Sequence, residues 1–151
     1  MKRVLMKIEL IKIGKPTTQE SRVLVDMYLT RTKVLNPIER IEFKDLEALK
    51  SRNKTLFSAG QWVVVLDERG KEWTSPELSQ QFKKWLEDPA IKSVSFVIGG
   101  PYGLDEEIRK RANTVWSLSK GTLPSDLAWV MASEQIYRAF TILKGMPYHH
   151  A

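Results

Sequence analysis

The sequence predicts an α/β protein with a mainly parallel sheet. Segments with β-type alternation or continuous apolar residues recur between segments with helical spacing, as βαβ units require. The runs at 62–66 and 94–98 are continuously apolar or rich in β-branched residues, which is typical of parallel strands covered on both faces. No repeat, low-complexity tract or Pro/Gly/Ser linker divides the chain, so we expect residues 1–151 to form a single domain.

The elements of the first half follow from apolar spacing. Residues 7–13 alternate as K-I-E-L-I-K-I and predict a strand. Apolar residues at helical spacing predict a helix over 18–33, and a second alternation predicts a strand over 38–43. A further helix, with Gly60 just past its end as a stop, is indicated by the apolar residues Leu46, Leu49, Leu56 and Phe57.

In the second half, the strand at 62–66 is followed by a predicted loop over 67–71. Residues 75–77 predict a helix start, with Ser75 as the side-chain cap, then a proline, then an acid near the positive end of the helix dipole. That helix ends by Pro89. The remaining elements are a strand and two helices, over 94–98, 105–112 and 127–143.

The composition excludes several classes of protein. Hydrophobic residues make up 42% and charged residues 28%, as in a soluble globular domain. No apolar run approaches the roughly 18 residues that span a bilayer. The N-terminus lacks a small-residue cleavage site, so we expect no signal peptide, and Met6 is an alternative start to Met1. The absence of cysteine excludes disulfide scaffolds and thiol catalysis, and it agrees with a cytoplasmic location.

The charged residues narrow the choice of ligand. Both histidines, His149 and His150, stand at the tail, so we expect no metal site and no internal Ser-His-Asp triad. The net charge of +6 permits a polyanionic partner. We expect ligands beyond the carboxyl ends of the strands, where 66–71 and 99–103 are rich in glycine. Those glycines could equally serve tight turns alone.

The same segments lack the usual nucleotide signatures. Neither a P-loop nor the three-glycine dinucleotide fingerprint is present. Residues 105–107 place three acids in the helical turn after the second glycine segment, where they would repel a di- or triphosphate. A neutral or cationic small molecule therefore fits better, and a sulfonium methyl donor meets that description.

An ordered set of motifs runs through the C-terminal part of the chain and ends in Pro-Tyr-His at 147–149. The earlier motifs are I-G-G-P-Y-G at 98–103, W-S-L-S at 116–119, T-L-P at 122–124 and E-Q-I-Y-R-A at 134–139. With these motifs the sequence from Gly99 onward resembles the RlmH-like branch of the SPOUT methyltransferases, the trefoil-knotted RNA methylases. The upstream segments 8–15 and 66–71 also fit this family.

The resemblance implies a homodimeric enzyme that uses S-adenosylmethionine to methylate N3 of a pseudouridine in large-subunit ribosomal RNA. The target would be the intersubunit hairpin near the decoding centre, presented by free RNA or by an assembled ribosome. A C-terminal trefoil knot over 99–143 is implied as well. The donor pocket would be formed by Leu66, Gly100, Ser119, Lys120, Gly121, Thr122, Leu123 and Pro124.

Two positions depart from the family's pattern. Ser125 stands where the family usually has His, and Trp129 stands where it usually has Arg. Gly121 also occupies a position where an apolar residue is common. These departures motivate an alternative, in which the chain is a catalytically impaired SPOUT-fold module that binds RNA or a small molecule. A generic α/β phosphate-binding hydrolase is a second alternative, which the acidic helix start disfavours.

The candidate catalytic residues are Arg138, Tyr148 and His149. Arg138 lies four residues after Glu134, so it could simply form an ion pair along the helix. Alternatively, its guanidinium could stabilise the negative charge that develops on the target base during catalysis. The proton of the target nitrogen would go to His149 or Tyr148. Tyr102 either covers the glycine turn or stacks on an RNA base.

The last helix also predicts a dimer. Residues 127–132 are apolar in all directions around one and a half turns. A helix that is apolar all round must be buried on more than one side, and a domain of this size has little else with which to cover it. A second copy would cover it with the same patch, as isologous contacts do.

Overall fold

The computed structural model describes residues 5–14, 18–52, 55–100 and 103–150, in which five strands form one sheet in the order β2-β1-β4-β3-β5. Each pair of neighbouring strands is parallel, which confirms the predicted class. The strands are β1 (Lys7–Ile13), β2 (Ile38–Phe43), β3 (Gln61–Glu72), β4 (Ser93–Ile98) and β5 (Thr114–Ser117).

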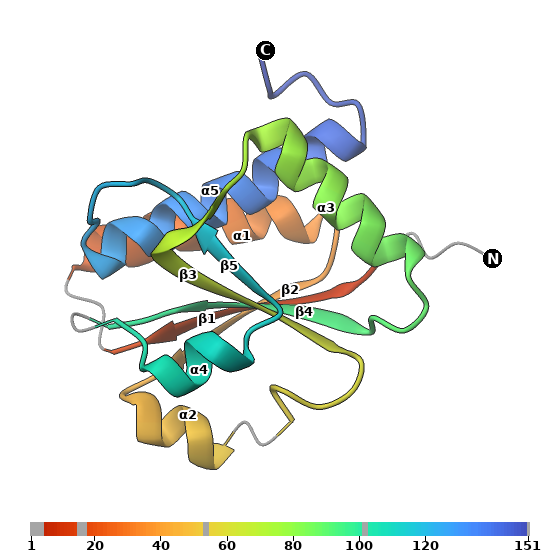
Figure 1. Cartoon of the computed structure of the whole chain (residues 1–151). Coiled ribbons are helices and arrows are strands. Elements are labelled where there is room, and N and C mark those ends of the chain that lie inside the picture. Colours follow the sequence, from red (N-terminus) through yellow and green to blue (C-terminus); the bar gives the residue numbers. More distant parts are fainter. Residues whose placement is uncertain (1–4, 15–17, 53–54, 101–102, 151) are drawn as a thin grey trace.

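Helices cover both faces of this sheet (Figure 1). On one face lie α1 (Gln19–Lys33), α3 (Ser75–Glu87) and α5 (Ser125–Leu143), and on the other lie α2 (Leu46–Arg52) and α4 (Glu106–Arg111). Two apolar clusters correspond to the two faces. Strand β4 is buried along its whole length, including Ser93 and Ser95, as predicted for a parallel strand covered on both faces.

Stacked aromatic rings hold the larger helical layer on the sheet. The ring of Phe82 on α3 lies 4.6 Å from that of Phe140 on α5 and 5.9 Å from that of Phe96 on β4. Trp85 packs edge-on against Phe82 at 5.2 Å. Because such pairs add packing energy beyond their buried area, they fix α3 and α5 relative to the strand that ends at the glycine turn.

Strand β3 is longer than the sequence suggested. The predicted loop over 67–71 is wrong, because the strand continues to Glu72. Leu66 and Lys71 both lie opposite Trp116, so the residues between them form a bulge. Beyond the bulge, β3 pairs again with β5. Strand β5 is too short to give a periodic signal in the sequence. A Cβ on Gly70 would lie 2.5 Å from the carbonyl oxygen of Val115, so the bulge needs glycine there.

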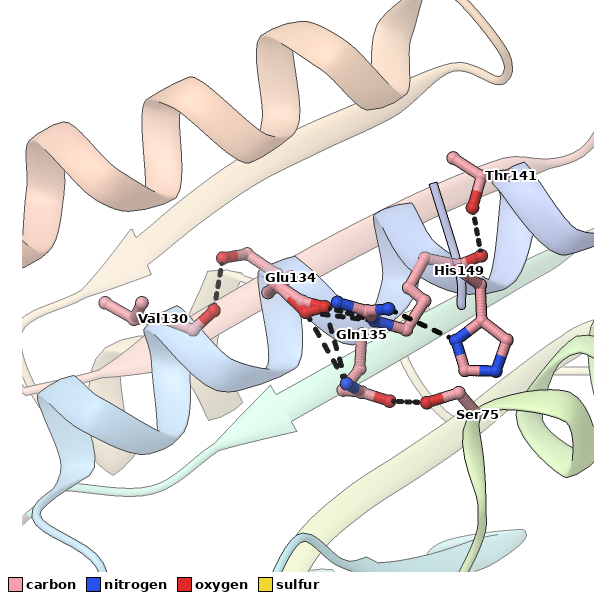
Figure 2. Close-up of polar contacts among 8 residues, drawn as sticks. Ser75, Val130, Glu134, Gln135, Thr141 and His149 are labelled. Atoms are coloured by element: carbon pink, nitrogen blue, oxygen red, sulfur yellow. Dashed lines mark hydrogen bonds and ion pairs between the residues drawn. The ribbon is translucent and has the colours of Figure 1, made fainter. Parts of the chain in front are cut away.

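Two predicted helix boundaries are also wrong. Helix α2 ends at Arg52, and Gly60, at φ +88°, instead turns the chain into β3. The cap of α3 is Thr74 rather than Ser75, because Thr74 and Glu77 form a reciprocal capping box. Ser75 already lies in the helix, and its hydroxyl donates to Gln135 Oε1 on α5 at 2.7 Å (Figure 2).

The outer strand β2 is lined with charge. Glu39 and Glu42 are exposed, and Arg22 on α1 lies 3.6 Å from Glu42. Arg40 pairs with Asp26 of the same helix. These contacts tie α1 to the edge of the sheet. Among the described residues, no helix has the length and apolar character needed to cross a bilayer.

Candidate functional site

A cavity of about 760 Å³ opens beside the bulge of β3 and beyond the carboxyl end of β4. The bulge of β3, the glycine turn after β4 and the segment that joins β5 to α5 form its walls. Gly103, at φ +72°, donates its N–H to the carbonyl of Gly100 at 2.9 Å and closes that turn. The parallel sheet therefore brings together segments that are distant in the sequence, as its topology requires.

Most of the residues expected to hold a donor meet at this cavity. Lys120 is the exception, since its side chain is 90% exposed and its Nζ lies 4.0 Å from Glu72 Oε1. The expected residues that line the wall are Leu66, Gly100, Ser119, Gly121, Thr122, Leu123 and Pro124. The sheet places Leu66 beside Gly100, and the continuous segment 119–124 brings the other residues to the same cavity.

The carboxylates of the cavity come from two elements, Asp67 and Glu68 from β3 and Asp126 from α5. Asp67 accepts two hydrogen bonds from Arg69, both at 2.8 Å, and lies 3.7 Å from Arg109. The bond to Asp67 raises the pKa of the Arg69 guanidinium above its usual value. Glu68 Oε2 accepts a hydrogen bond of 2.6 Å from Thr122 and thereby joins two of the walls.

The acids at 105–107 have a different role from the one expected. Asp105 caps α4 by accepting from the N–H of Ile108 at 3.0 Å, and that bond lowers the pKa of its carboxyl. Lys50 bonds Asp105 at 3.0 Å and lies 3.4 Å from Glu107. None of the three acids lines the cavity as described. Its negative side chains come from β3 and α5 instead.

Sequence reasoning missed a buried pair behind the cavity. Lys12 is fully buried, and its Nζ lies 3.6 Å from Asp126 Oδ1. The other oxygen of Asp126 accepts from the backbone N–H of Thr18 at 3.1 Å. A signal was present, because Lys12 shares the strand face of the fully buried Ile8 and Leu10 and so breaks their apolar alternation.

The expected catalytic residues also meet, at the C-terminal end of α5. Arg138 Nε bonds Glu134 Oε1 at 2.7 Å, and this contact raises the pKa of the guanidinium. The centre of that guanidinium lies 4.6 Å from the ring of Tyr148. Its NH1 lies 3.1 Å from Nδ1 of His149, whose ring faces α5 in Figure 2. We call Glu134, Arg138, Tyr148 and His149 the tail cluster.

The tail cluster limits which group can accept a proton. A guanidinium can only donate, so Nδ1 of His149 is the acceptor in its contact with Arg138. Burial, and then the charge of Glu134, raise the pKa of the Tyr148 hydroxyl above its usual value. Tyr148 therefore stays protonated at neutral pH.

The start of α5 and the C-terminal tail that follows it lie at opposite ends of the helix (Figure 1), and the cavity borders the start. Ser125 lines the cavity and Arg138 follows it by thirteen helical residues, a rise of about 20 Å. The structure therefore brings each expected group of site residues together but separates the two groups within one chain. Tyr102 lies outside the described residues.

No group of three or more metal-ligating acids or histidines occurs in the part of the chain that the structure describes. Around the cavity, Asp67 pairs with Arg69, Glu68 bonds Thr122, and Asp126 pairs with Lys12. The site is thus a glycine-walled cavity with carboxylates at its rim and a separate basic, aromatic cluster.

Comparisons with known proteins agree with this architecture. The family described as "Predicted SPOUT methyltransferase" matches residues 6–149. The ribosomal RNA large subunit methyltransferase H of Solidesulfovibrio magneticus is 40% identical over 95% of this chain and 98% of its own.

Solved structures share the fold. A probable methylase family protein from Haemophilus influenzae superposes with a TM-score of 0.58, over all of this chain and 72% of its own, at 12% identity. A putative methyltransferase from Legionella pneumophila, solved with bound cofactor SAM, gives a TM-score of 0.50 at 12% identity, over 89% of this chain and 66% of its own.

The pKa of Tyr148 gives a test of the tail cluster. We expect Glu134→Gln to lower it, because a negative charge that disfavours the phenolate is lost, and Arg138→Ala to raise it. An NMR pH titration of ¹³C-labelled tyrosines would measure both shifts, with Tyr148→Phe to assign the signal. A wild-type pKa at or below that of free tyrosine would contradict the described contacts.

Proposed function

Because this chain belongs to the SPOUT methyltransferases, we propose that it transfers the methyl group of S-adenosylmethionine to N3 of a pseudouridine in large-subunit ribosomal RNA. The proposal also includes a homodimer as the active form and the cytoplasm as its location. The observation that carries it is the meeting of the expected donor-binding residues at one cavity beside the bulge of β3 and beyond the end of β4.

The cavity suits a sulfonium donor. Its lining holds three acids, Asp67, Glu68 and Asp126, against one base, Arg69, which pairs with Asp67. The acids outnumber the base, so the potential of the cavity favours a cation over a phosphate. Apolar wall residues such as Leu66, Leu118 and Leu123 offer surface to an adenine ring. S-Adenosylmethionine supplies an electrophilic methyl group there. The chain's own contribution is to fix the donor by Gly100 and the turn 119–124, so that an incoming nucleophile meets it in line.

The tail cluster suits an RNA base. Arginine planes and aromatic rings are the groups on which unstacked bases rest, and Arg138 and Tyr148 supply both. The buried Tyr137 supports this surface from below, with its ring centre 4.7 Å from that of Tyr148. Arg138 would stabilise the negative charge that develops on the ring when N3 loses its proton, and His149 would accept that proton.

A two-fold dimer would unite the cavity and the tail cluster. Helices α1 and α5 contact each other, and both carry exposed apolar side chains, namely Val23, Leu24, Leu127 and Met131. Trp129 and Ala132, on the other side of α5, are fully buried against the sheet. If two α5 helices cross with opposite directions, the tail cluster of one subunit approaches the cavity of the other, which offsets the separation of about 20 Å.

Donor binding tests the cavity. We expect Gly100→Val to abolish S-adenosylmethionine binding in a calorimetric titration, because the branched side chain would fill the space that the backbone leaves. A Cβ alone already lies 3.3 Å from the carbonyl oxygen of Ile13, so Gly100→Ala should weaken binding less. Thermal melting serves as the folding control. Normal binding by a folded Gly100→Val protein would place the donor elsewhere.

Turnover tests the tail cluster. We expect Arg138→Ala to leave donor binding intact but to lower the methylation rate at least about tenfold, which is about 1.4 kcal/mol of barrier. Ribosomes that lack the modification are the substrate. Arg40→Ala removes a surface ion pair of the same type and is the matched control. An unchanged rate in a folded variant would leave Arg138 as half of a helical ion pair.

Mixing the two inactive variants tests the shared site. A heterodimer of Gly100→Val and Arg138→Ala subunits keeps one site with an intact cavity and an intact tail cluster. Random exchange at equal concentrations should therefore restore about one quarter of the wild-type activity. Light scattering on the same samples gives the oligomeric state. A monomer that methylates RNA, or a mixture that stays inactive, would contradict a site built from two subunits.

A further inference from the structure

Lys12 is a fully buried charge in the centre of the sheet. It lies near the end of β1, opposite Ile98 of β4, and Ile98 itself lines the cavity. Burying an ammonium costs several kcal/mol unless close partners offset the loss of water. A methionine or leucine would satisfy the apolar face that Lys12 shares with Ile8 and Leu10. The packing of the core therefore does not explain why a charged residue stands here, and the reason must lie in the groups that surround its ammonium at the end of β1.

The partners of Lys12 belong to the wall of the cavity. Its Nζ lies 3.5 Å from Ser125 Oγ and 3.6 Å from Asp126 Oδ1, and it donates to the carbonyl of Ile13 at 3.4 Å. The ring of Trp129, one turn further along α5, lies 6.0 Å away. Lys12 thus stands directly behind the first turn of α5, on the side away from the cavity.

That first turn lacks an anchor of its own. The residue at the N-cap of α5 is Pro124, and no side chain there bonds the free N–H groups of the helix. Asp126 supplies a favourable charge to the helix dipole, and it is held from outside by Lys12 of β1 and by the N–H of Thr18 at the start of α1. Three elements therefore meet at one carboxylate.

The two positions that depart from the family's pattern lie at this corner as well. Ser125 and Trp129 are both neighbours of Lys12. The positive charge here comes from β1, while α5 contributes the carboxylate. Ser125 and Trp129 on the helix and Lys12 on the strand form one local arrangement.

We propose that Lys12 is a positioning residue for the donor, acting through its buried pair with Asp126 to hold the first turn of α5 as a wall of the cavity. This inference rests on the proposed function, since it takes the cavity as the donor site. Lys12 does not touch the reacting atoms in this arrangement. Its effect falls on donor affinity rather than on the chemical step.

The test compares Lys12→Met with the double variant Lys12→Met/Asp126→Asn in the full chain. The single change removes the Lys12 ammonium from the buried Asp126 carboxylate, and we expect it to lower thermal stability and donor affinity together. The double variant contains no isolated buried charge, so we expect its melting temperature to recover towards that of the wild type. Its dissociation constant for S-adenosylmethionine should stay raised at least about tenfold, or about 1.4 kcal/mol.

Steady-state kinetics separates positioning from catalysis. In the double variant the KM for the donor should rise while kcat at saturating donor stays close to that of the wild type. Lys50→Met, which removes surface ion pairs to Asp105 and Glu107, is the matched control and should change neither constant.

The outcomes divide clearly. A folded double variant that binds the donor as tightly as the wild type would overturn the inference and leave the proposed function standing. A double variant that cannot fold would also overturn it, because the pair would then serve the whole fold rather than the cavity wall. A wild-type protein that binds no S-adenosylmethionine would instead refute the proposed function.

Discussion

Helix α5 is one uninterrupted run from Ser125 to Leu143, and its rise of about 1.5 Å per residue places its two ends far apart. The first turn borders the cavity, and Arg138 near the other end organises the tail cluster. The aromatic contacts to α3 and β4 hold this helix in place, so neither end can approach the other by bending. The need for a second subunit in the proposed reaction follows from that rigidity.

Opposite charges serve different parts of the molecule. The chain carries a net charge of +6, which favours a polyanion such as RNA, yet the side chains that line the cavity include Asp67, Glu68 and Asp126. An acidic recess in a basic protein can hold a small cation while the surrounding surface holds RNA. The two ligands then do not compete for the same groups.

Much of the fold could be predicted from sequence because its strands are short, apolar and separated by helices. The bounds of β1 and β2 were found to the residue, and the glycine segments led to the cavity. Local patterns failed where tertiary partners decide the outcome. Strand β3 extends past Leu66 because β5 pairs with Lys71, and Thr74 caps α3 because Glu77 reaches back to it.

The candidate sites divide in the same way. Motifs identified Arg138, Tyr148 and His149 as a group, but nothing in their spacing showed how far they lie from the cavity. Lys12 could have been identified from the sequence, because it interrupts the apolar alternation of its strand. Its partner Asp126 could not, because it lies 114 residues away at a helix start, where polar residues are common. Acids at 105–107 were assigned to the cavity because they follow the glycine turn, but that turn directs them to α4 and Lys50.

The charged outer edge of β2 has a consequence for how this protein associates. An uncovered edge strand is a template on which further strands can add without limit, as in fibrils. Glu39, Arg40 and Glu42 oppose that growth, because an incoming strand would have to strip water from them and displace the ion pairs to α1. Concentrated solutions should therefore contain assemblies of fixed size rather than open-ended aggregates.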